Sequence, residues 1–108
     1  MMRFYPLEKL SKLYDGYQKV VRIENEILLF IQSAGERYLI ENVCPHRRMP
    51  FASTNVPASI TDDIIRCPAH RFEFNLGNGA NTRPGVPACG RLRLYQLAYH
   101  DDQIGVEL

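Results

Sequence analysis

Two short segments of the sequence, Cys44-Pro45-His46 and Cys67-Pro68-Ala69-His70, each place a cysteine just before a histidine. Twenty residues separate the two segments. A tight loop can direct a thiolate and an imidazole into one space, so two such loops side by side would supply four metal ligands. All but one of the cysteines and all but one of the histidines belong to these pairs. The pattern predicts a metal centre, against the alternative that these are ordinary loop residues.

The donor set of two cysteines and two histidines fits two kinds of centre. One is a [2Fe–2S] cluster of the Rieske type, in which two Cys hold one iron and two His hold the other. The other is a structural zinc site in an interaction module, but zinc sites usually pair like with like, as C-x₂₋₄-C and H-x₃₋₅-H. A C-x-H segment is short for that pattern, so the sequence favours the cluster and leaves zinc as the less favoured alternative.

The rest of the chain is typical of an all-β protein. Runs rich in β-branched and aromatic residues predict strands at 19–23, 27–31 and 37–40, and turn-like residues separate them. Residues 60–66 predict a hairpin with Asp62-Asp63 at its tip. Further strands are expected at 72–74, 92–97 and 104–108. Only 7–14, with leucines at a spacing of three to four, predicts a helical turn or two, and His100 is expected on the surface in a turn.

We expect one domain over residues 1–108. Its base, an antiparallel β-sandwich or barrel-like unit, would come from about 1–41 and 91–108. The cluster-binding loop subdomain would span about 42–90. Six of the seven prolines lie in that middle part, where their fixed φ and missing N–H mark loops rather than central strands.

Composition sets limits on the class of protein. Hydrophobic residues make up 45% and charged residues 23%, which is ordinary for a soluble globular domain. No run approaches the ~18 apolar residues of a membrane span, and the N-terminus lacks the apolar stretch of a signal peptide. Three cysteines is an odd count, which suits a reducing compartment and leaves Cys89 outside the ligand set. The expectation is a cytoplasmic monomer that binds neither membrane nor nucleic acid.

The two segments and the residues after them resemble the Rieske ferredoxins, the electron carriers of bacterial ring-hydroxylating dioxygenase systems, and related stand-alone Rieske proteins. Residues 72–79 resemble the aromatic strand and glycine turn after the second ligand segment, 83–88 the proline loop that shields the cluster, and 92–95 the returning strand. The resemblance implies a Rieske fold and one [2Fe–2S] cluster per chain. It implies these cluster ligands: Cys44, His46, Cys67 and His70. It places these residues around the cluster: Arg47, Arg48, Pro68, Arg71, Phe72 and Pro84.

The sequence departs from the family pattern at positions that bear on the loops and the potential. Arg48 and Arg71 stand where relatives often have glycine, so both loops need a backbone conformation that a β-carbon tolerates. Neither loop has the second cysteine that high-potential Rieske proteins use for a disulfide. Phe72 and Phe74 replace the Ser and Tyr hydroxyls that donate to the cluster in those proteins. These features predict a potential near the bottom of the Rieske range, about −150 mV.

The predicted function is that of a soluble one-electron carrier with no catalysis of its own. If His46 and His70 bind the cluster, only His100 remains. A mononuclear iron site typically needs two histidines and a carboxylate, so the chain has too few histidines for one. The carrier would need a flavin-dependent reductase upstream and an oxygenase or other redox acceptor downstream. Arg47, Arg48 and Arg71 are candidates for docking acidic partner faces. The alternatives are the small Rieske subunit of another reductase, such as the nitrite reductase small-subunit type, and the zinc-binding module.

Overall fold

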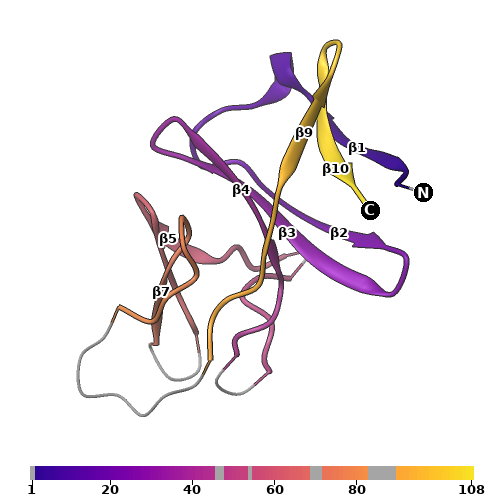
Figure 1. Cartoon of the computed structure of the whole chain (residues 1–108). Coiled ribbons are helices and arrows are strands. Elements are labelled where there is room, and N and C mark those ends of the chain that lie inside the picture. Colours follow the sequence, from indigo (N-terminus) through magenta and orange to yellow (C-terminus); the bar gives the residue numbers. More distant parts are fainter. Residues whose placement is uncertain (1, 46–47, 54, 69–71, 83–89) are drawn as a thin grey trace.

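The computed structural model describes residues 2–45, 48–53, 55–68, 72–82 and 90–108. In this part of the chain the strands form three sheets, and every described strand pair is antiparallel (Figure 1). The strands are β1 Phe4–Lys9, β2 Gln18–Ile23, β3 Glu26–Ser33, β4 Glu36–Glu41, β5 Ser59–Thr61, β6 Ile64–Arg66, β7 Glu73–Asn75, β8 Leu94–Tyr95, β9 Leu97–His100 and β10 Gln103–Glu107. A single 3₁₀ turn, Leu10–Lys12, follows β1.

The three sheets are joined through the central one. The terminal sheet has the order β1-β10-β9 and brings both chain ends together, the central sheet has the order β2-β3-β4-β8, and the loop sheet has the order β5-β6-β7. In Figure 1 the terminal sheet lies at one end of the molecule and the loop sheet toward the other. The central sheet therefore separates the chain termini from the segments that carry the cysteine–histidine pairs.

Strand β3 shows why the central sheet can have a core on each face. Side chains alternate between the two faces of a strand, and four successive residues of β3 are buried. Leu28 and Phe30 pack in the core shared with the terminal sheet. Leu29 and Ile31 pack in the core shared with the loop sheet and the two cysteines. The continuous apolar run of the sequence thus marks a strand covered on both sides.

The all-β prediction is confirmed, and several predicted strands agree closely with the structure. β2, β3 and β4 cover the runs predicted at 19–23, 27–31 and 37–40. The hairpin predicted with Asp62-Asp63 at its tip joins β5 to β6, because Thr61 pairs with Ile64. Asp62 adopts φ +54°, the left-handed conformation that Asp tolerates better than most residues in a tight turn. The base predicted as a sandwich is the pair formed by the terminal and central sheets.

The helical prediction for 7–14 is wrong over most of its length. Leu7 is the buried residue of strand β1, and only the 3₁₀ turn is helical. The leucine spacing suggests a helix because Leu7 and Leu10 pack on the same core from a strand and a turn in succession. Pro6 is accommodated because β1 is an edge strand of the terminal sheet, where a missing N–H can face outward.

The single strand predicted at 92–97 is divided between two sheets. Leu94 and Tyr95 pair with β4 in the central sheet, and Leu97 begins β9 of the terminal sheet. The chain passes at Gln96 from the central sheet to the terminal sheet and so links the two. His100 is not in the turn but is the last residue of β9, where its ring stacks on Phe4 with centroids 3.9 Å apart.

No helix in the part of the chain that the structure describes is long and apolar enough to cross a membrane.

Candidate metal centre

The first cysteine lies in a loop that backbone hydrogen bonds fold tightly. Cys44 follows β4 and is completely buried. Its N–H donates to the carbonyl of Met49 at 2.7 Å, and its carbonyl accepts from the N–H of Arg48 at 2.7 Å. These two bonds close a narrow loop around residues 45–48. The segment expected to carry a ligand histidine therefore emerges from a fixed stem.

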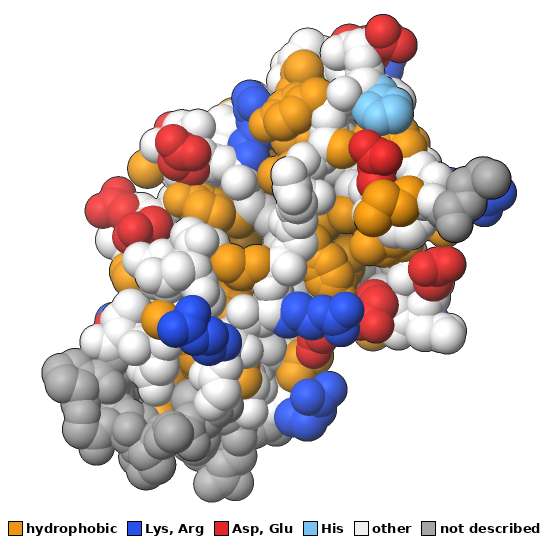
Figure 2. Space-filling view, in the orientation of Figure 1, with side chains coloured by type: hydrophobic (Ala, Val, Ile, Leu, Met, Phe, Trp, Pro, Cys, Tyr) orange, Lys and Arg blue, Asp and Glu red, His pale blue; other side chains and the backbone are white. Residues whose placement is uncertain are grey.

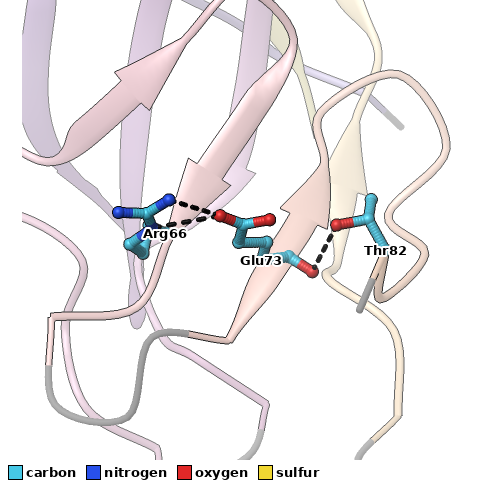
Figure 3. Close-up of polar contacts among 3 residues, drawn as sticks. All are labelled: Arg66, Glu73 and Thr82. Carbon is cyan, nitrogen blue, oxygen red and sulfur yellow. Dashed lines mark hydrogen bonds and ion pairs between the residues drawn. The ribbon is translucent and has the colours of Figure 1, made fainter. Parts of the chain in front are cut away.

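The second cysteine begins an equally narrow loop between β6 and β7. Cys67 is completely buried, and its N–H donates to the carbonyl of Phe72 at 2.7 Å. One step outward, Arg66 and Glu73 are register partners, and Arg66 Nε lies 3.1 Å from Glu73 Oε2 (Figure 3). Both guanidinium contacts go to that one oxygen, and the pair is half-exposed, so it contributes about 1 kcal/mol at most.

A third segment is anchored beside this stem. Thr82 N donates to the carbonyl of Glu73 at 2.9 Å, and the Thr82 hydroxyl also points at this carbonyl (Figure 3). Leu92 N donates to the carbonyl of Gly79 at 2.8 Å. Thr82 is therefore tied to β7, the strand that follows the second loop, and Leu92 is tied to the turn after that strand.

The two cysteines share one hydrophobic core. Cys44 and Cys67 both pack in the cluster formed between the central sheet and the loop sheet. In this cluster Phe51 and Phe74 meet edge to face, with ring centroids 6.1 Å apart. Segments separated by more than twenty residues of sequence thus place their thiols in one apolar environment, which suits a centre that must be shielded from water.

Part of the predicted site lies outside the described residues. His46, Arg47, His70, Arg71 and Pro84 belong to this set, as does Cys89. Among the residues that the structure does describe, no group of three or more Cys, His, Asp or Glu side chains comes together as a metal site. The four-ligand set stays a prediction, and the structure supplies the positions of its two cysteines.

The other predicted neighbours of the centre differ in exposure. Phe72 is buried and closes the second loop through its carbonyl, whereas Pro68 is exposed. Phe74 is fully buried, so its aromatic ring packs in the core that also contains the two cysteines. No hydroxyl is present at either phenylalanine position to donate toward a cluster.

Arg48 combines exposure with an unusual backbone. Its side chain is 77% exposed and its φ is +55°, in the left-handed region. A conformation that glycine adopts most readily is thus taken here by a residue with a β-carbon. The Arg48 guanidinium lies 3.9 Å from Glu41, which also lies 3.6 Å from Arg93. Glu41 therefore lies within ion-pair distance of two arginines.

Sequence reasoning missed Asn42, two residues before the first cysteine. Asn42 is buried, and its side-chain amide makes three hydrogen bonds to the backbone of Phe51 and Ala52. These residues lie just beyond the other end of the first loop. The only signal in the sequence is an uncharged polar residue between Glu41 and the apolar Val43, and its partners cannot be inferred from spacing.

Comparison with protein families shows what kind of domain this is. The model of the Rieske [2Fe-2S] domain matches residues 3–96, which is most of the chain. The chain therefore belongs to the Rieske [2Fe–2S] domain family, and the family resemblance inferred from the sequence is confirmed. Its cofactor is a [2Fe–2S] cluster, one per chain. Two buried cysteines at the stems of paired loops fit such a cluster, which two thiolates hold on one iron.

Solved structures share the fold at low sequence identity. A ferredoxin of Sphingomonas yanoikuyae B1 is 21% identical, with a TM-score of 0.79 over 98% of this chain and 99% of that one. The ferredoxin of carbazole 1,9a-dioxygenase from Nocardioides aromaticivorans IC177 is also 21% identical, with a TM-score of 0.75 and 95% of each chain covered.

A further match comes from an assembled system. In a reduced complex between oxygenase and ferredoxin of carbazole 1,9a-dioxygenase, one chain is 21% identical with a TM-score of 0.78. The match covers 95% of this chain but 27% of that longer one. No curated protein sequence matches the chain.

Proposed function

We propose that the protein is a one-electron carrier that receives electrons from a flavin-dependent reductase and passes them to an oxygenase. The observation that carries the proposal is the Rieske domain match over residues 3–96, together with the two buried cysteines at the stems of paired loops. Two of the structural neighbours are a ferredoxin of a dioxygenase and a complex of ferredoxin with oxygenase. These neighbours support an oxygenase as the acceptor.

The proposed ligands are Cys44 and Cys67 on the inner iron and His46 and His70 on the outer one. When bound, the cluster supplies reversible one-electron chemistry. The protein holds the two thiolates in a dry core, where backbone bonds fix the stem of each loop. Histidine ligation at the outer iron would leave imidazole edges as the path for electrons to a partner.

Two alternatives are less well supported. A small Rieske subunit of another reductase, such as the nitrite reductase type, would share the fold, but the structural neighbours named for this chain are ferredoxins and dioxygenase components. A zinc-binding module would not be expected to match a [2Fe–2S] domain over most of its length. Iron and sulfide analysis separates zinc from the cluster directly.

The ligand set and the potential are tested in one experiment. The protein is purified anaerobically, reduced with dithionite and followed by EPR during a redox titration. We expect the lowered average g value of a cluster with mixed Cys and His ligation and a midpoint near −150 mV. An average g value typical of all-cysteine clusters would disprove the ligand set. A midpoint above 0 mV would contradict the inference drawn from Phe72 and Phe74.

The docking face of the proposed carrier is basic. Between residues 37 and 93 there are eight arginines and four acidic residues, while the two ends of the chain together carry five basic and eight acidic residues. Figure 2 shows Lys and Arg side chains gathered toward the end of the molecule where the loops lie. Of the proposed docking residues Arg47, Arg48 and Arg71, the described one, Arg48, is strongly exposed. This charge pattern supports a partner with an acidic surface.

The charge of this face can be measured with small redox probes. The reduced protein is mixed in a stopped-flow instrument with anionic ferricyanide or with cationic hexaammineruthenium. We expect Arg47→Glu, Arg48→Glu and Arg71→Glu together to slow the anionic probe about tenfold at low ionic strength and to accelerate the cationic one. Added salt should reduce both effects.

The matched control is Arg22→Glu, a single charge reversal at an exposed residue of β2, compared with Arg48→Glu alone. It changes net charge equally, but β2 does not carry a ligand loop. Equal effects of the two single reversals would show that only total charge matters and would argue against a docking face.

A further inference from the structure

Asn42 is the one buried polar or charged residue in the described part of the chain, at 3% exposure. Its Oδ1 accepts from the N–H of Phe51 at 3.0 Å and from that of Ala52 at 3.1 Å. Its Nδ2 donates to the carbonyl of Ala52 at 2.8 Å. A buried amide is stable only when its donors and acceptors are satisfied, and here three of its bonds go to one short stretch of backbone.

These bonds close the first ligand loop from outside. Residues 43–50 lie between Asn42 and Phe51, and the Cys44–Met49 and Arg48–Cys44 backbone bonds lie inside that closure. The N–H of Asn42 itself donates to the carbonyl of Ile27 in the central sheet at 2.9 Å. The side chain thus fastens the far end of the loop to a residue that the central sheet already holds.

The closure also reaches the second loop. Phe51, whose N–H is held by Asn42, packs its ring edge to face on Phe74. Phe74 lies in β7, directly after the second loop, and pairs with Ile65 just before it. The position of the first loop relative to the second therefore depends on a chain of contacts that begins at Asn42.

We propose that Asn42 is a positioning residue of the metal centre, which sets the placement of the first ligand loop against the second through Phe51. The proposal rests on the proposed ligand set for its effect on the cluster. Asn suits the task because its short amide presents an acceptor for two N–H groups and a donor for one carbonyl. An apolar residue of equal size would leave those three backbone groups unsatisfied in a dry core.

The test compares Asn42→Leu with Gln18→Leu in the cluster-containing protein. Gln18 is a matched control because its side-chain amide also clamps a backbone, donating to the carbonyl of Ala58 and accepting from its N–H. Its partner Ala58 packs in the same core as the two cysteines but lies outside both ligand loops, residues 43–50 and 67–72. We expect Asn42→Leu alone to shift the EPR g values and the midpoint potential, and to release the cluster to a chelator about tenfold faster than the control.

The route through Phe51 is tested with a double variant. If Asn42 acts through that ring, Asn42→Leu and Phe51→Leu together should shift the g values no further than the larger single effect, because two residues in one contact chain are not additive. Additive shifts would overturn the route. Unchanged g values and potential in Asn42→Leu, with only the loss of stability that Gln18→Leu also shows, would overturn the proposal itself.

A second readout does not depend on the iron ligands. In the cluster-containing protein, the Cys67 amide, which bonds to the Phe72 carbonyl, should exchange with solvent about tenfold faster in Asn42→Leu than in Gln18→Leu. Equal exchange rates would contradict the proposal even if the wild-type EPR spectrum disproved the ligand set. If Asn42→Leu does not fold, Asn42→Ser, which keeps a hydroxyl, is measured in its place with the same expected direction.

Discussion

Arg48 shows how a substitution in a ligand loop can keep the geometry and store strain. A residue with a β-carbon in the left-handed region is less stable than glycine there, by roughly 1–2 kcal/mol. The loop nevertheless holds φ +55° at Arg48, because its N–H bonds to the carbonyl of Cys44. The backbone conformation at Arg48 therefore has a cost in local energy.

Arg48→Gly should therefore stabilise the protein by about 0.5–1 kcal/mol, after the greater freedom of glycine in the unfolded chain is subtracted. The ion pair with Glu41 at 3.9 Å is too exposed to offset this gain. Denaturant unfolding at neutral pH measures the change. Arg48→Ala removes the same charge but keeps the β-carbon, so it should give no gain; an equal gain from both variants would show that charge and not φ is responsible.

The pair of Tyr17 and Glu8 gives a pH-dependent prediction at a single residue. The Tyr17 hydroxyl donates to Glu8 Oε2 at 2.7 Å, and this bond is the main cause that lowers the pKa of Glu8. Burial, followed by the bond to Glu8, raises the pKa of Tyr17, so the phenol stays protonated at neutral pH. The stability linked to Glu8 is present above its unfolded pKa and is lost as pH falls through its lower folded pKa.

Tyr17→Phe should consequently raise the pKa of Glu8 toward its ordinary value. NMR titration of the Glu8 carboxyl carbon in the two proteins measures this. Asp15, whose pKa is lowered mainly by the N–H of Gly35, serves as an internal control and should not move. An unchanged Glu8 titration in Tyr17→Phe would show that the phenol is not the cause of the shift.

At the scale of the site, sequence identifies the cysteines but not what holds them. A cysteine two residues before a histidine is visible in a single line of sequence. The closure by Asn42 is not visible in the sequence. It depends on partners nine and ten residues away, which come close to Asn42 only because the loop folds back. The sequence shows that an arginine stands at position 48, where the resemblance leads one to expect glycine. Only the structure shows that this arginine adopts a left-handed φ.

At the scale of elements, three strands that agree closely with sequence expectations belong to the central sheet. β2, β3 and β4 are successive neighbours in one sheet, so local pattern and local pairing coincide. β1 escapes prediction because it is an edge strand that contains Pro6 and a register shift before Glu8. Residues 92–97 resemble a single strand in the sequence. The alternation of polar and apolar residues continues where the chain passes from one sheet to the next, so the pattern does not reveal the change.

The terminal sheet depends on one glycine for its packing. Gly105 lies in β10 between Pro6 and Ala98, and a β-carbon there would clash with the Tyr5 carbonyl and lie 2.8 Å from the ring of Phe4. That ring stacks in turn on His100. The missing side chain therefore makes room for an aromatic pair across the sheet.

Gly105→Ala should destabilise the protein by about 2–3 kcal/mol, since both the backbone of β1 and the Phe4 ring must move. Denaturant unfolding measures the loss. In Gly105→Ala/Phe4→Ala only the ring contact is relieved, so the clash with the Tyr5 carbonyl should keep most of the cost. A loss below about 0.5 kcal/mol in the single variant would show that β1 is not tightly held.

At the scale of the whole molecule, the two cores depend differently on the cluster. The core between the terminal and central sheets contains neither cysteine, whereas the other core contains both. Without iron and sulfide, the second core would have to bury two unligated thiols at the ends of narrow loops. We expect the protein without its cluster to keep the terminal and central sheets and to loosen around Cys44, Cys67 and the loop sheet.

Hydrogen exchange followed by mass spectrometry tests this expectation. In the protein without its cluster, amides of β2, β3 and β10 should stay protected, and those of residues 43–53 and 64–76 should exchange faster than in the cluster-containing protein. Uniform loss of protection would mean that the molecule is one cooperative unit that cannot fold without its cofactor.

The burial of β3 on both faces has a consequence for how the protein is matured in the cell. Leu28 and Phe30 complete their core with residues of the central and terminal sheets, so half of the packing around this strand is independent of metal delivery. The opposite face, with Leu29 and Ile31, would then be in place before the cluster is inserted. The ligand loops could pack against it as the cluster binds. A donor protein that transfers iron and sulfide would meet a domain whose terminal and central sheets are folded and whose ligand loops are not. Insertion of the cluster would then be the last folding step.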